Sequence, residues 1–100
     1  MLHTAGIVGA RPDGTAPESV GDQAVEVWRT ILAILDEAGF EPADIVSYTT
    51  YVVAGEDLRA VMTARDDALL PHTAASTLVT VPALARPQWK VETAVIAARA

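Results

Sequence analysis

The sequence has no cysteine, which excludes disulfide bonds and thiolate chemistry. Basic residues are also scarce: 7 lysines and arginines stand against 13 acidic residues, with a net charge of −6 and no basic run. Because nucleic-acid-binding proteins concentrate positive charge on one face, this balance argues against a nucleic-acid partner. No apolar run reaches the ~20 residues of a membrane span, and the N-terminus lacks the pattern of a signal peptide. We therefore expect no membrane partner and a cytoplasmic location.

Hydrophobic residues, in contrast, make up 51% of the 100-residue chain. A chain of this length forms one domain and buries roughly two-thirds of the surface that its unfolded state exposes. The hydrophobic content is high for so small a domain. We therefore expect other subunits to cover part of its apolar surface.

Stretches rich in Val, Ile and Thr predict four strands, over residues 2–8, 45–53, 78–81 and 91–97. In the second of these, alternation predicts one face made of Val46, Tyr48, Thr50 and Val52, and another made of the residues between them. Neither face is fully polar. Helices can cover one face, but a domain of this size has nothing left to cover the other, which again predicts an oligomer.

Two helices are predicted between these strands. The first begins after Ser19, a candidate N-cap, and runs to about residue 38, where Gly39 ends it. Its predicted buried stripe is Ala24, Trp28, Ile31, Leu35 and Ala38. The second covers residues 55–70 and ends at Pro71, with a predicted buried face of Leu58, Val61, Met62 and Leu69. Helices that join strands in this way predict an α+β fold, a mixed sheet with both helices packed on one face.

Glu92 is the first candidate for chemistry, because it places a carboxylate in a strand that is otherwise nearly all apolar. The alternative is that its side chain points to solvent on an open sheet face. His72 is a weaker candidate for a general base, and His3 is weaker still. No set of His, Asp and Glu has metal-ligand spacing, and no glycine-rich phosphate loop is present, so we expect no metal site.

The stretch from Ala74 to Glu92 resembles the C-terminal signature of the Rid family, the YjgF-like reactive intermediate deaminases. Small residues at its start are followed by apolar positions, a leucine at 84 and the pair Val91–Glu92. Residues 3–9, 23–31 and 38–52 resemble further patterns of the family in the same order. The resemblance implies a chorismate-mutase-like, YjgF-like fold for one domain over residues 1–100. It also implies a homotrimer with clefts between subunits. Relatives usually carry a further strand before the equivalent of Leu2, so we expect either a start assigned too late or a missing strand.

The same resemblance implies a site that binds a small molecule in the intersubunit cleft without a cofactor. Glu92 would position or activate a water molecule, while Gly6, Ser76 and Thr77 would line the cleft. In deaminase members an arginine occupies the place of Ser76 and grips the carboxylate of a 2-imino acid, which is hydrolysed to a 2-keto acid and ammonia. Serine cannot provide the two charge-assisted hydrogen bonds of that guanidinium. Arg65 and Arg86 are the candidates to compensate.

Three other positions also depart from the family pattern. Ala5 replaces a serine, Met62 stands where asparagine is usual, and Leu78 stands where cysteine is common. These residues predict a less polar cleft, which suits an imine or enamine hydrolase with a bulkier or uncharged substrate. A non-catalytic homotrimer that binds a small ligand or a partner protein is the alternative. A cyclase or lyase activity is a third hypothesis, from fold analogy alone.

Overall fold

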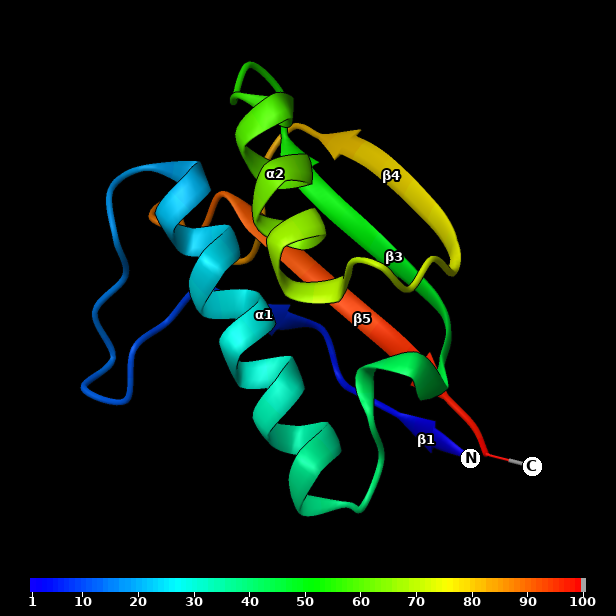
Figure 1. Ribbon diagram of the computed structural model, residues 1–100. Coiled ribbons are helices and arrows are strands. Elements are labelled where there is room, and N and C mark those ends of the chain that lie inside the picture. The colour runs from blue at the N-terminus through cyan, green and yellow to red at the C-terminus, as the bar shows by residue number, and fades with distance from the viewer. Residues whose placement is uncertain (100) are drawn as a thin grey trace.

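The computed structural model describes residues 1–99 of the chain and contains the predicted kinds of element in the predicted order (Figure 1). The elements are β1 (Leu2–His3), β2 (Ile7–Val8), α1 (Val20–Glu37), the 3-10 turn η1 (Pro42–Asp44), β3 (Ile45–Val53), α2 (Leu58–Leu69), β4 (Ala75–Val81) and β5 (Val91–Ala97). The predicted bounds of the strands 45–53 and 91–97 are confirmed.

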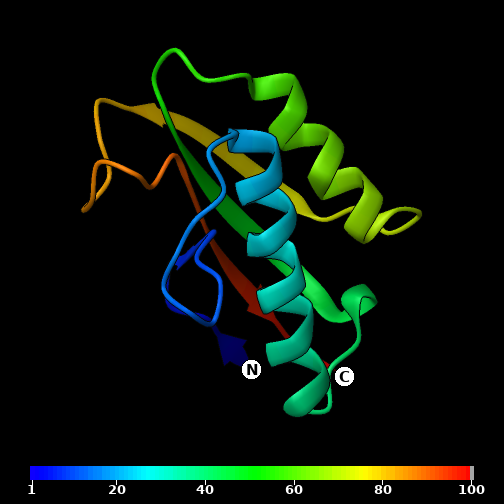
Figure 2. The same ribbon diagram turned by 90° about the vertical axis from the view of Figure 1, so that its left-hand side faces the viewer.

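The strands form one mixed sheet in the order β1-β5-β3-β4, and β2 also pairs with β5. Strands β3 and β4 are parallel, whereas β5 is antiparallel to each of its neighbours. Both helices lie on the same face of this sheet (Figure 2), so the predicted α+β architecture is confirmed. Strand β1, near the N-terminus, lies beside the last residues of β5 (Figure 1), because Leu2 pairs with Ala97.

The hydrophobic core lies between the helices and the sheet. Side chains at helical spacing on α1, among them Trp28, Ile31 and Leu35, are buried against alternate residues of β3 and β5. Trp28 meets Tyr48 of β3 edge to face, with ring centroids 5.3 Å apart. Ala38, which was predicted to continue the stripe, is exposed because it is already the C-cap residue of α1.

A β-bulge corrects the predicted faces of β3. The pairing with β5 shifts between Ile45 and Ser47, so Val46 has no partner there and its side chain is 52% exposed. Ile45 is buried instead and joins Tyr48 on the face that the helices cover. Alternation alone could not predict this, because one extra residue in a strand reverses the faces on either side of it.

Further features differ from the sequence prediction. Helix α2 begins at Leu58 rather than at residue 55, because the Asp57 side chain caps its first turn. Residues 2–8 form two short strands rather than one, with an irregular segment that includes Gly6 between them. Strand β4 begins at Ala75, three residues before the predicted start, because β3 continues the parallel pairing that far. Met62 is 39% exposed rather than buried, since it lies at the margin of α2 beside the edge strand β4.

Candidate functional site

Glu92 and Gly6 lie in direct contact. Glu92 is the second residue of β5 and pairs with Tyr51 of the neighbouring strand β3. A Cβ atom added at Gly6 would lie 2.6 Å from the carboxylate carbon of Glu92, so a larger residue at this position would force the Glu92 carboxylate to move. The Glu92 side chain is partly buried and forms no ion pair or side-chain hydrogen bond within residues 1–99. A carboxylate in this setting is free to bind water or a ligand.

The other two predicted site residues lie on the edge strand β4, on opposite faces of the sheet. Ser76 pairs with Tyr48 and therefore lies on the face that carries the helices, whereas Thr77 pairs with Thr49 on the open face. Glu92 pairs with Tyr51, which puts it on the open face with Thr77. A single chain thus brings Gly6 and Glu92 together, but separates them from Ser76 by the thickness of the sheet.

Ser76 opens instead onto a pocket that the sequence prediction did not describe. This pocket lies between the C-terminal half of α2 and the start of β4 and has a volume of about 200 Å³. It is lined by Tyr48, Arg65, Asp66, Leu69, Leu70, His72, Thr73, Ala74 and Ser76. The sequence offered Arg65 as a candidate to compensate for Ser76, but it could not show that the two residues line one pocket.

Arg65 is the cation of this pocket, and its charge is partly balanced by its neighbour on α2. Its Nε and Nη2 atoms lie 2.9 and 2.8 Å from the same carboxylate oxygen of Asp66. Burial by itself would lower the pKa of Arg65, but interactions with Asp66 and with the Tyr48 phenol outweigh it and raise that pKa above its ordinary value. Arg65 therefore remains charged at every working pH.

The remaining sequence candidates have structural explanations. His72 Nε2 donates a hydrogen bond of 3.0 Å to the main-chain oxygen of Ile45, which fixes the segment that leads into β4. Arg86, the second candidate to compensate for Ser76, lies over the Trp89 ring, 5.5 Å from its centroid, in the exposed loop before β5. Of the two arginines, Arg65 is the one that lines the Ser76 pocket.

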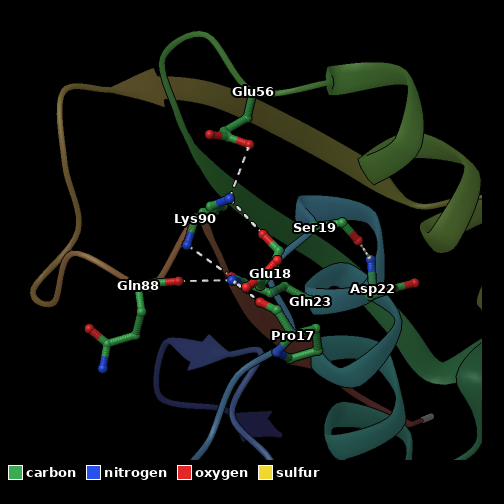
Figure 3. A network of polar contacts seen from close by, with 8 residues as sticks. All are labelled: Pro17, Glu18, Ser19, Asp22, Gln23, Glu56, Gln88 and Lys90. Carbon is green, nitrogen blue, oxygen red and sulfur yellow. Dashed lines mark hydrogen bonds and ion pairs between the residues drawn. The ribbon is translucent and has the colours of Figure 1, made fainter.

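A buried glutamine holds the loop that leads into β5 and so fixes the strand that carries Glu92 (Figure 3). The Gln23 side chain of α1 is fully buried, and its Nε2 donates to the main-chain oxygens of Pro17 and Gln88, both at 2.8 Å. Its Oε1 accepts from the main-chain nitrogen of Lys90 at 2.9 Å. Lys90 Nζ in turn donates to the main-chain oxygen of Glu18. Sequence reasoning assigned no role to this polar residue on the buried face of α1.

No group of three or more His, Asp or Glu side chains within residues 1–99 converges as metal ligands would. Neither helix of the described part of the chain is long and apolar enough to cross a membrane.

The architecture is the YjgF-like α+β fold, and comparison with known proteins identifies the family. The model of the family described as endoribonuclease L-PSP matches residues 1–99, and the chain belongs to this family. YyfB from Yersinia pestis, a Rid-family protein, is 29% identical; the match covers 96% of this chain and 76% of YyfB, with a TM-score of 0.85. The comparison with curated proteins gave no match.

Two other solved structures extend this likeness. Escherichia coli TdcF, solved with bound serine, is 25% identical; the match covers 98% of this chain and 80% of TdcF, with a TM-score of 0.88. A Mycobacterium tuberculosis member of the YjgF/YER057c/UK114 family is 26% identical. That match covers 93% of this chain and 74% of the other, with a TM-score of 0.82.

Proposed function

We propose that this chain is a divergent family member that hydrolyses an imine or enamine intermediate in a cleft between the subunits of a homotrimer. The observation that carries the proposal is the carboxylate of Glu92, which is partly buried, makes no ion pair within residues 1–99 and lies against Gly6. A partly exposed carboxylate without a protein partner is available to water and to a small substrate.

The homotrimer is supported by the face of the sheet that carries no helix. Its apolar side chains remain partly or largely exposed in one chain, as at Tyr51, Val79 and Ile96. Glu92 and Ser76 lie on opposite faces, so a cleft that uses both needs a second copy of the chain. Burial of the open face against other copies would cover these apolar side chains.

The proposed reaction adds water across a carbon–nitrogen double bond. Glu92 accepts a proton from the water molecule while the water oxygen bonds to the imine carbon, and Glu92 passes this proton to the imine nitrogen. The resulting intermediate carries a hydroxyl and an amino group on one carbon. Transfer of the hydroxyl proton to the amino nitrogen through Glu92 then releases ammonia as the carbon–oxygen double bond forms. The net reaction is a hydrolysis that needs no cofactor, and general-base help of this kind contributes about 10²- to 10⁴-fold. The serine bound to TdcF, a small amino acid, supports a substrate of similar size.

The name of the family suggests a second activity, cleavage of RNA, and the composition argues against it here. A net charge of −6 without a basic cluster gives the RNA backbone no surface to bind. The stronger alternative is a non-catalytic homotrimer that binds a small ligand or a partner protein. Ser76 in the place of the family arginine is the observation that favours it.

The test is imine hydrolysis by the wild-type chain and by Glu92→Gln. An amino-acid oxidase generates imines from a panel of amino acids, and semicarbazide traps those that escape hydrolysis. We expect faster loss of at least one imine, reduced about 10²-fold or more in Glu92→Gln. Glu37→Gln, at the exposed end of α1, is the matched control and keeps full activity. Activity that survives in Glu92→Gln, or a monomer by light scattering, contradicts the proposal. Inactivity toward every imine favours the non-catalytic trimer.

A further inference from the structure

Helix α1 carries a second apolar line beside the stripe that it buries against the sheet. Val25, Trp28 and Leu32 follow one another at helical spacing on this side of the helix. Trp28 belongs to the buried core, whereas Leu32 is only partly buried and Val25 is 45% exposed. The apolar surface of α1 therefore extends beyond the part that the sheet covers.

This line forms one wall of a groove between the two helices. The opposite wall consists of Ala64, Asp67 and Ala68 of α2, and the groove has a volume of about 370 Å³. The helices approach each other closely at their first turns, where a Cβ atom added at Gly21 would lie 3.2 Å from the Cβ atom of Ala60. They separate toward their C-terminal ends (Figure 2), and the groove lies beyond the close contact.

One negative charge at this groove has no protein partner. Arg29, on the α1 side, pairs with Glu26 one turn before it, so these two charges cancel. Asp67, on the α2 side, is exposed and makes no ion pair within residues 1–99. An occupant that places a basic residue at this rim would pair with Asp67, while its apolar side chains cover the floor of the groove.

From the two apolar walls and the unpaired Asp67 we propose that this groove binds an amphipathic helix of a partner protein, with lysine or arginine beside its apolar face. The ridge of side chains on such a helix can lie between α1 and α2 as helices pack on one another elsewhere. The groove belongs to the helical layer, so its occupant leaves the open face of the sheet free (Figure 2). The inference is therefore independent of the proposed reaction.

Fluorescence anisotropy with a labelled peptide of about 14 residues, made of leucine and lysine in a helical period, tests the proposal. Two peptides of the same length are controls: one has the same composition in scrambled order, and the other has glutamate in place of lysine. We expect the wild-type chain to bind the lysine peptide at least ~10-fold more tightly than either control at physiological ionic strength.

Variants at the groove locate the binding. Ala68→Gln places a longer polar side chain in the groove, keeps good helix propensity and should weaken binding ~10-fold or more. Ala33→Gln, the same change at an exposed position of α1 outside the groove, should bind like the wild type. Asp67→Lys should weaken binding of the lysine peptide and strengthen binding of the glutamate peptide. Glu37→Lys, the same reversal at the exposed end of α1, should do neither.

Each other outcome contradicts the proposal. These outcomes are no saturable binding, equal binding of the three peptides, unchanged affinity in Ala68→Gln and an equal loss in Ala33→Gln. A smaller assembly of Ala68→Gln by light scattering also contradicts it, because the groove would then be a contact between copies of the chain. If Ala68→Gln does not fold, Val25→Thr decides, because Val25 is 45% exposed: ~3-fold weaker binding supports the proposal and unchanged affinity overturns it.

Discussion

Replacement of Gln23 by methionine should destabilise the fold far more than its position on a helix suggests. The side chain is fully buried, and its amide satisfies the oxygen of Pro17, the oxygen of Gln88 and the nitrogen of Lys90. Methionine has a similar length and no comparable donor or acceptor. The substitution therefore removes three hydrogen bonds at once. Their main-chain partners then bond to water where water can reach them, and otherwise remain unsatisfied.

The size of the effect follows from the burial of each partner. The hydrogen bond to Pro17 is buried, so its loss costs about 1–3 kcal/mol for the unsatisfied oxygen. The other two are partly buried and cost about 0.5–1.5 kcal/mol each, because water can reach the freed groups. The sum is about 2–6 kcal/mol, a large part of the ~5–15 kcal/mol that stabilises a typical domain.

Urea unfolding, followed by circular dichroism at one protein concentration, measures this loss. Gln88→Met is the matched control, because Gln88 takes part only through its main chain and its side chain is exposed. Gln23→Glu tests the same contacts through the pH dependence of stability. The new carboxylate lies against two carbonyl oxygens, so the pKa of this glutamate is raised in the folded state. Stability should therefore be lowest at neutral pH and partly recover as the pH falls below that pKa. A Gln23→Met variant within about 0.5 kcal/mol of the wild type would refute the reasoning.

Two smaller predictions concern contacts in the sheet and around the candidate site. Thr50→Val should lower the free energy of unfolding by about 1–2 kcal/mol, because it leaves the Thr93 hydroxyl, buried 3.2 Å from that of Thr50, without its partner. Replacing both threonines by valine should restore most of this stability in a double-mutant cycle. Gly6→Ala should change stability little, because the flexible Glu92 carboxylate can turn away, but should reduce activity as Glu92→Gln does. Gly9→Ala should lower the free energy of unfolding by about 1–3 kcal/mol in thermal or urea unfolding, since its Cβ would lie 2.6 Å from the Gln23 main-chain oxygen. Equal losses of stability in Gly6→Ala and Gly9→Ala would contradict this difference between the two contacts.

The sequence predicted those parts of the fold that depend on local patterns. The bounds of β3 and β5 and the N-cap of α1 follow from β-branched runs and from a serine that can cap. The bulge at Val46 and the break before Ile7 were missed, because both arise from the register of pairing with β5, which is distant along the chain. Gln23 was missed for the same reason: its partner groups lie on loops at both ends of the chain.

For the candidate site too, local patterns identified the residues, whereas their arrangement depends on how distant strands pair. The sequence identified Glu92, Gly6, Ser76 and Thr77, but a list of residues carries no information about the face of the sheet on which each lies. The pairing of Ser76 with Tyr48 and of Glu92 with Tyr51 places the two on opposite faces, three positions apart along β3. An odd separation has this result wherever the strand runs without a bulge, as it does between Tyr48 and Tyr51. Ser76 therefore lies beside α2, whereas Glu92 lies beside the N-terminal segment that contains Gly6. Arg65, a helix residue 11 positions before Ser76, therefore lines the same pocket as Ser76 although no local pattern connects the two.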